Sequence, residues 1–248
     1  MLIDSHIHVG QFNHLYFAPS SVQRLMEQVG VSYYAVSSTT QCEENYPKVL
    51  NEIEEIICLD KEKVLPVMWI TPEGLKGNIA WYLESNIKWK MLKIHPFLNK
   101  GEWTPGRGYI EEVADIAREL SVPILIHTGE DACCTASLFE TTIKENKDVV
   151  FILAHGRSLV DSLEMTKKYS NAYADSAFMP IDDMNVFLKK GLQHKLLWGT
   201  DMCIPKYFYP EQNMYSYYKA KLDTFRIVSS QEQFERVTYK NAQEIFNL

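Results

Sequence analysis

The sequence predicts a single-domain (β/α)8 TIM barrel over residues 1–248, with an extra helix at its C-terminal end. Short apolar segments alternate with amphipathic ones along the whole chain, which is the pattern of βα units around a parallel sheet. There are eight such pairs in 248 residues, the usual size of a closed barrel. No low-complexity segment or linker divides the chain, so we expect one domain.

The short apolar segments are the predicted strands. Several are apolar almost throughout, as strands buried on both faces are. The predicted strands are Leu2–His6, Tyr33–Ser38, Val64–Ile70, Trp89–His95, Val122–His127, Val149–His155, Asn171–Ser176 and Lys195–Gly199. An open, doubly wound sheet is the alternative, but it would carry a glycine-rich phosphate turn after the first strand. The segment His6-Ile7-His8-Val9-Gly10 stands there instead, which favours the barrel.

The amphipathic segments are the predicted helices. Pro47 is placed to begin one of them, and Gly30 and Gly191 are placed to end others. The predicted helices are Ser21–Val29, Pro47–Leu59, Leu75–Ser85, Tyr109–Leu120, Ala136–Glu145, Leu159–Tyr169, Asp182–Lys190, Met214–Val228 and the additional Gln231–Phe246.

Composition excludes several classes of partner. The net charge is -7 and no stripe of Lys and Arg is present, so nucleic acid is not an expected partner. No apolar run approaches the roughly 20 residues that cross a bilayer, so no membrane span is expected. The five cysteines have no disulfide-framework spacing, and the first motif begins at Asp4, which leaves no room for a signal peptide. We therefore expect a cytoplasmic protein with a small-molecule substrate.

Histidines gather at the ends of the predicted strands. Five of the seven histidines lie at or just past such an end, and Asp201 follows the eighth strand. These histidines are His6, His8, His95, His127 and His155. Barrels place their active sites at the C-terminal ends of their strands. Imidazole and carboxylate are ligands that zinc prefers, so the sequence predicts a divalent metal site, with zinc as the favoured ion.

His6 and His8 are two residues apart on a strand, so their side chains leave the same face and both can reach one ion. Asp4 shares that face one layer deeper, where it could orient a histidine. His127 and His155 each end an apolar strand. Taken singly, such a histidine is more often a hydrogen-bonded core residue, but the whole constellation favours chemistry.

An ordered set of motifs resembles the amidohydrolase superfamily. The motifs are Asp4-x-His6-x-His8, Lys93-Ile94-His95-Pro96, Ile126-His127-Thr128-Gly129, Leu153-Ala154-His155-Gly156 and Gly199-Thr200-Asp201. The set spans essentially the whole chain. It is most similar to the amidohydrolase-related (amidohydrolase 2) branch, which includes aminocarboxymuconate-semialdehyde decarboxylase and pyrone-dicarboxylate lactonase. The closing segment Lys240-Asn241-Ala242-Gln243-Glu244-Ile245-Phe246 resembles the last helix of that branch.

This resemblance implies a ligand set and a reaction. His6, His8, His127 and Asp201 would bind one metal ion, most simply zinc. A metal-activated water would then hydrolyse an amide, lactone or ester bond of a small molecule. Asp201 would take the proton of this water and pass it to the leaving group. His155 would polarise the scissile carbonyl or stabilise the oxyanion.

Lys93 leaves a second metal open. It lies two positions before His95 on the same face, where a lone buried ammonium is costly. Its segment resembles those of urease and dihydroorotase that carry a carboxylated, metal-bridging lysine. On that interpretation His127 and His155 bind a second ion, while Lys93 joins the ligands of the first. We favour one ion, which makes His95 a substrate-side residue.

Other interpretations remain at this stage. Decarboxylation of a small unsaturated or aromatic acid is the main alternative, because the same branch does both. A TatD-like nuclease or a non-enzymatic binding protein is less favoured.

Several residues outside the metal set have open roles. Asp175 ends the seventh strand and could support a metal ligand, contact the substrate or cap a turn. Arg107 and Arg157 could bind a substrate carboxylate, whereas Glu130 and Asp131 would oppose it. The tyrosines between positions 207 and 218 suit a lid, a pocket wall or a subunit interface, and the last would make a homodimer.

Overall fold

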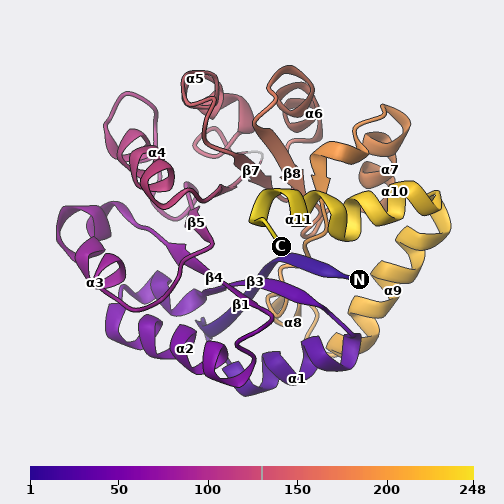
Figure 1. The fold of residues 1–248 in the computed structure, drawn as a ribbon, viewed down its shortest axis with the longest axis horizontal. Coiled ribbons are helices and arrows are strands. Elements are labelled where there is room, and N and C mark those ends of the chain that lie inside the picture. Colours follow the sequence, from indigo (N-terminus) through magenta and orange to yellow (C-terminus); the bar gives the residue numbers. More distant parts are fainter. Residues whose placement is uncertain (130) are drawn as a thin grey trace.

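A computed structural model describes residues 1–129 and 131–248 of the protein, so Glu130 lies outside the described residues. Eight parallel strands form the inner ring, and helices surround them (Figure 1). The parallel strands are β1 (Ile3–Phe12), β3 (Tyr33–Ser38), β4 (Val64–Trp69), β5 (Met91–Ile94), β6 (Ile124–His127), β7 (Phe151–Ala154), β8 (Ala172–Asp175) and β9 (Leu196–Leu197). The predicted (β/α)8 barrel is confirmed.

The barrel closes between its first and last strands. The Ser5 N–H donates to the carbonyl of Trp198 at 2.9 Å, and the Asp201 N–H donates to the carbonyl of His6 at 2.8 Å. Closure therefore brings the His6 segment of β1 next to the Asp201 segment after β9, although the two are far apart in the sequence.

The outer layer consists of helices of unequal length. The α-helices are α1 (Pro19–Val29), α2 (Tyr46–Leu59), α3 (Ile79–Leu83), α4 (Tyr109–Leu120), α5 (Glu140–Glu145), α6 (Leu159–Lys168), α7 (Ile181–Lys189), α8 (Pro205–Phe208), α9 (Met214–Val228), α10 (Gln231–Glu235) and α11 (Asn241–Phe246). Short 3₁₀ or π turns are η1 (Thr39–Glu43), η2 (Gly74–Asn78), η3 (Ala136–Phe139), η4 (Gln193–Lys195) and η5 (Arg236–Lys240). No helix among the described residues is both long and apolar enough to cross a membrane.

Three of the elements that differ from the sequence prediction do so for a visible reason. The first strand continues to Phe12, because its end pairs antiparallel with β2 (Leu15–Phe17) in a hairpin. The predicted helix Leu75–Ser85 is shortened by a π turn that contains two glycines, which are weak helix formers. The predicted helix Gln231–Phe246 is interrupted at η5, where the carbonyl of Val237 accepts a hydrogen bond from the Trp198 N–H.

The barrel interior is divided into an apolar and a polar layer. Met91 and Lys93 share the interior face of β5, and Leu125 and His127 share that of β6. The deeper residue of each pair belongs to an interior apolar cluster, which α11 completes with Ala242 and Phe246. In Figure 1, α11 (yellow) lies across the barrel near the N-terminus of the chain. The titratable side chains are thus confined to the other end, where the strands finish.

A buried carboxylate joins the ends of β1 and β3. Glu52 of α2 is 3% exposed and accepts hydrogen bonds from Ser38 Oγ at 2.5 Å and Thr40 Oγ1 at 3.0 Å. Thr40 Oγ1 in turn accepts the Gln11 N–H at 2.9 Å. Gly10 packs against this cluster with φ +92°, and an added Cβ would lie 2.6 Å from Glu52 Oε2. Glycine is therefore required here for both conformation and space.

We expect Gly10→Ala to destabilise the fold more than Gly30→Ala. Gly30 also has a positive φ of +84°, but nothing lies within 4 Å of its added Cβ. Gly30→Ala should cost about 1 kcal/mol of unfolding free energy through left-handed strain alone. Gly10→Ala should cost about 1–3 kcal/mol more through overpacking. Denaturant titration measures both, and equal costs would show that the Glu52 cluster is not tightly packed.

Candidate metal and substrate site

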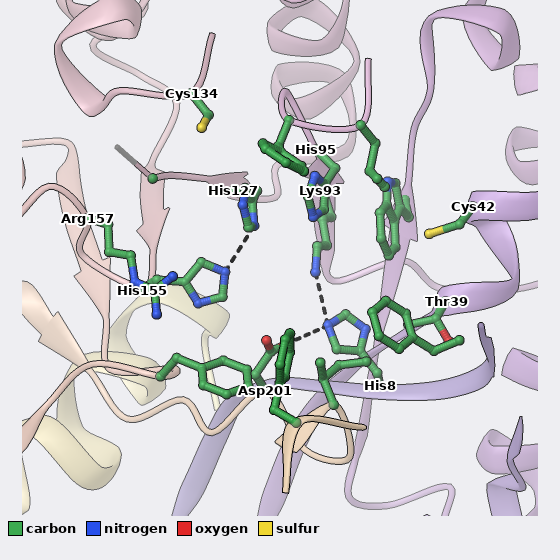
Figure 2. Close-up of a pocket in the computed structure, with 18 of the residues that line it drawn as sticks. His8, Thr39, Cys42, Lys93, His95, His127, Cys134, His155, Arg157 and Asp201 are labelled. Carbon is green, nitrogen blue, oxygen red and sulfur yellow. Dashed lines mark hydrogen bonds and ion pairs between the residues drawn. The ribbon is translucent and has the colours of Figure 1, made fainter. Parts of the chain in front are cut away.

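A pocket of about 490 Å³ opens at the C-terminal end of the barrel (Figure 2). Most of the residues predicted from the strand ends line it: His8, Lys93, His95, His127, His155 and Asp201. His6 lies just beneath the pocket and is 1% exposed. The barrel therefore gathers the titratable residues of five strand ends around one cavity.

Three of the predicted metal ligands converge at the floor of this pocket. His8 Nε2 lies 2.8 Å from Asp201 Oδ1, and His6 Nε2 lies 3.3 Å from the same oxygen. The two Nε2 atoms are 3.2 Å apart. Ligand atoms that share one zinc ion at about 2.0–2.1 Å lie roughly 3 Å apart, so these two imidazoles and one carboxylate fit a divalent ion in both spacing and chemistry.

The far side of each ring is anchored. His6 Nδ1 donates to Asp175 Oδ2 at 2.9 Å, so its proton sits on Nδ1 and its Nε2 lone pair faces the centre. His8 Nδ1 lies 3.0 Å from Ser37 Oγ. Burial, together with the charge of Lys93, lowers the pKa of His8 to about 3, which keeps the ring in the neutral form that binds metals.

Asp175 is the residue that organises this end of the barrel. Its Oδ1 accepts the backbone N–H groups of His155 and Ala177, both at 2.9 Å, while Oδ2 holds the ring of His6. Burial by itself would raise the pKa of Asp175, but His6, His155 and these hydrogen bonds hold the pKa below its usual value. The sequence left its role open between support and capping, and the structure has it do both.

Asp4 acts differently from the expectation that it orients a histidine ring. Its Oδ2 accepts from Thr200 Oγ1 at 2.6 Å, and its Oδ1 accepts the N–H groups of Thr200 and His6, both at 3.2 Å. The reason is geometric: barrel closure places the segment after β9 against Asp4. Asp4 thus fixes the backbone next to Asp201, and the carboxylate on the His6 ring comes from β8.

Lys93 points at the same centre. Its Nζ lies 2.9 Å from His6 Nε2, 3.1 Å from His8 Nε2 and 4.6 Å from the centroid of the Trp69 ring. The side chain is 2% exposed, and among the described residues no carboxylate lies within 4 Å of its Nζ. Burial lowers the pKa of Lys93 to about 8.

The other three strand-end histidines, His95, His127 and His155, form a second group across the pocket. His127 Nδ1 lies 3.0 Å from His155 Nε2, and the His127 ring stacks on His95 with centroids 3.8 Å apart (Figure 2). His95 stacks in turn on Trp69 at 5.4 Å. Among the described residues, the groups with metal-binding spacing are His6–His8–Asp201 and His6–His155–Asp175. The structure thus brings three predicted ligands together and pairs the fourth, His127, with His155.

The hydrogen bonds of His155 restrict its chemistry. Its Nδ1 lies 3.1 Å from the carbonyl oxygen of Ala177, which can only accept, so Nδ1 carries the proton. The lone pair of Nε2 then faces His127 Nδ1, 3.0 Å away, and burial lowers the pKa of the His155 ring to about 4. A neutral ring held in this way can accept a proton or bind a cation, but it has no proton to give a substrate carbonyl. This geometry differs from the predicted role of polarising the carbonyl.

Two of these residues have unusual backbone conformations. His155 has φ +67° and Asp201 has φ +58°, in the left-handed region that side-chain-bearing residues seldom adopt. The backbone N–H of each residue is held by a neighbouring strand. The His155 N–H donates to Asp175 Oδ1 on β8, and the Asp201 N–H donates to the carbonyl of His6 on β1. Such strain persists where the surrounding structure over-determines the backbone, as at functional sites.

We expect Asp175→Asn to weaken metal binding. The neutral amide removes the charge that holds the His6 Nδ1 proton, and loss of such a partner typically lowers metal affinity about 10–100-fold. Competition titration of Zn²⁺ against a chromophoric chelator measures this, on samples whose unfolding temperature shows that they are folded. Asp223→Asn, at an exposed acid of α9, is the control and should leave the affinity unchanged. Unchanged affinity in Asp175→Asn would mean that Asp175 does not support a metal ligand.

Comparison with known proteins agrees with this geometry. The family model described as Amidohydrolase matches residues 69–248. No curated protein matches the sequence significantly.

Solved structures share the fold at low sequence identity. An amidohydrolase from Burkholderia multivorans with bound zinc has a TM-score of 0.70 at 9% identity, covering 100% of this chain and 99% of that one. The 5-carboxyvanillate decarboxylase of Sphingomonas paucimobilis has 0.67 at 10% identity, with coverage of 100% and 99%. The dihydroorotase of Campylobacter jejuni has 0.63 at 14% identity, with coverage of 100% and 83%.

The match over residues 69–248 includes every predicted site residue except those of the first strand. The histidines of the first strand lie at the floor of the same pocket, next to Asp201. The chain therefore belongs to the amidohydrolase family and is an enzyme of that superfamily, as the ordered motifs predicted.

Proposed function

We propose that this enzyme is a metal-dependent hydrolase that cleaves an amide, lactone or ester bond of a small molecule. The observation that carries the proposal is the convergence of His6 Nε2, His8 Nε2 and Asp201 Oδ1 at the floor of a pocket. Zinc is the first candidate for the ion, because two imidazoles and a carboxylate match its preferences. When bound, such an ion acts as a Lewis acid and makes a water molecule acidic.

Asp201 is the proposed proton carrier. Burial would raise its pKa, but His6 and His8 hold the pKa well below its usual value, so the carboxylate is ionised. It is 6% exposed and lines the pocket, where it can take a proton from an attacking water and return it to a leaving group. The closing hydrogen bond from its N–H to the carbonyl of His6 keeps this carboxylate in place.

His155 and His95 are proposed to act on the substrate side. His155 lines the pocket, and its Nε2 lone pair, which meets His127 Nδ1 in this structure, would accept a proton or a hydrogen bond from a bound substrate or water once His127 is a metal ligand. His95 has a buried Nδ1 without a partner among the described residues, and its ring lines the pocket. Burial and the charge of Lys93 lower the pKa of His95 well below its usual value, so it too is neutral.

We propose one ion per chain, with His127 as the further ligand that the family resemblance implies. The alternative is a second ion held by His127 and His155, with Lys93 carboxylated. The closeness of Lys93 Nζ to both His6 and His8 is the observation that keeps this alternative in view.

Removal of the metal should abolish activity. Treatment with a chelator should reduce turnover to background, and Zn²⁺ or another divalent ion should restore it. His8→Ala should lose turnover by about 100-fold or more and resist restoration, because a ligand is missing. Activity is sought in a panel of lactones, amides, esters, phosphoesters and unsaturated carboxylic acids. Release of CO2 from the last group would replace hydrolysis by decarboxylation, and full activity without metal would refute the proposal.

The number of ions is testable on the same protein. We expect one ion per chain by elemental analysis and an unmodified mass for the peptide that carries Lys93. His127→Ala should lower metal affinity, whereas His95→Ala, which removes the ring stacked on it, should not. Two ions and a mass increase matching a carboxyl group on Lys93 would establish the two-metal alternative instead.

A further inference from the structure

Large apolar side chains lie around the mouth of the pocket. Phe97 and Leu98 follow β5, whereas Phe208 and Tyr209 lie at and just after the end of α8, in the segment that follows β9. All four line the pocket, and we call them the apolar mouth. In the ring of eight parallel strands, β5 is the fourth and β9 the last. Because the ring is closed, the two segments face each other across the opening.

The apolar mouth is exposed, unlike the reactive groups beneath it. Phe208 is 56% exposed and Leu98 is 50% exposed. By contrast, His8, Lys93 and Asp201 at the floor are buried (Figure 2). A single exposed apolar side chain is ordinary on a protein surface, but several around one opening mark a place where an apolar group binds. Since this opening leads to the floor, a small molecule that reacts at the floor would also lie against the apolar mouth.

The charged side chains of the pocket lie elsewhere. Lys93 and Asp201 belong to the floor. Among the described residues that line the pocket, the other charged side chains are Asp131 and Arg157, which follow β6 and β7 and have opposite signs. The apolar mouth itself offers no charge to pair with an ionised group. It therefore favours an uncharged apolar group, whose removal from water is favourable, over a charged group that would lose its hydration.

Aromatic contacts fix Phe208 in its place at the mouth. Its ring meets that of Tyr207 edge to face at 5.2 Å and that of Phe178 at 5.7 Å. Tyr207 meets Phe12 in the same way at 5.2 Å. Phe12 belongs to β1 and Phe178 follows β8, so these contacts join α8 to the two strands on either side of β9. A wall that is already ordered binds an apolar group at a lower entropic cost. Of the roles that the sequence left open for this tyrosine-rich segment, the packing favours a pocket wall.

We propose that the apolar mouth binds an uncharged apolar arm of the substrate while the scissile bond lies at the floor near Asp201. The substrate class is then an amide, ester or lactone that carries an alkyl or aryl group of several carbons. The cavity of about 490 Å³ is within the range of roughly 300–1,000 Å³ that is usual for small-molecule sites. The identity of the reacting group rests on the proposed function, but binding of the arm does not.

Straight-chain alkyl hydroxamates test this assignment, because the hydroxamate group binds the metal while the length of the alkyl group varies. Calorimetry measures the affinity of acetohydroxamate, butanohydroxamate and hexanohydroxamate for the zinc-loaded enzyme. Each added methylene should raise the affinity about three- to fourfold, the usual gain when a methylene leaves water. Phe208→Ser and, independently, Leu98→Ser should weaken hexanohydroxamate more than acetohydroxamate. The matched control Ile227→Ser, at an exposed apolar residue of α9 that does not line the pocket, should change neither affinity.

The same alkyl lengths are compared on metal-free protein as 1-alkanols, whose binding needs no ion, by ligand-observed NMR. A gain with length that Phe208→Ser and Leu98→Ser reduce would support the apolar mouth even if the protein binds no metal, a result that would refute the proposed hydrolase alone. An affinity that does not depend on length, or a gain that both variants retain in full, would overturn the inference. Sedimentation that shows a wild-type dimer and monomeric variants would also overturn it, because the apolar mouth would then be a subunit interface.

Discussion

The carboxylate of Asp175 is the constraint on which the rest of the site depends. It lies at the end of β8 and joins three strands: one oxygen holds the ring of His6 from β1, and the other holds the backbone of His155 after β7. Because these hydrogen bonds are buried and charge-assisted, they are strong and directional. They fix the tautomer of His6 and the left-handed backbone of His155 at once. Asp4 has the matching function at the seam, where it fixes Thr200 beside Asp201.

A cluster of buried titratable groups is costly, and the barrel limits this cost in two ways. The interior beneath the site is apolar and closed by α11, so only one layer is polar. Within that layer the pKa values of His8, His95, His127 and His155 are lowered, which keeps these rings neutral. Asp175 and Asp201 are ionised because imidazoles and N–H groups surround them. The arrangement is one in which lone pairs and negative charge face a common point, and a divalent ion would satisfy them together.

The barrel fold and the loops around the pocket have different roles in this protein. The fold is shared with a dihydroorotase and a 5-carboxyvanillate decarboxylase at low identity, so the barrel by itself does not select the reaction. The walls belong to loops that differ among barrels. In this chain, Phe178, Phe208 and Arg157 line the pocket from such loops and from α8.

Local periodicity by itself determined the fold class, the inward face shared by His6 and His8, and the set of histidines at strand ends, because strand direction and side-chain alternation are properties of short segments. Only the tertiary structure decided which groups meet. The His6 ring donates to Asp175 and not to Asp4, and His127 contacts His155. Arg157 lines the pocket, whereas Arg107 does not. The last predicted helix is interrupted at Val237. These contacts join segments far apart in the chain, and they depend on strand register and barrel closure, which no single segment encodes.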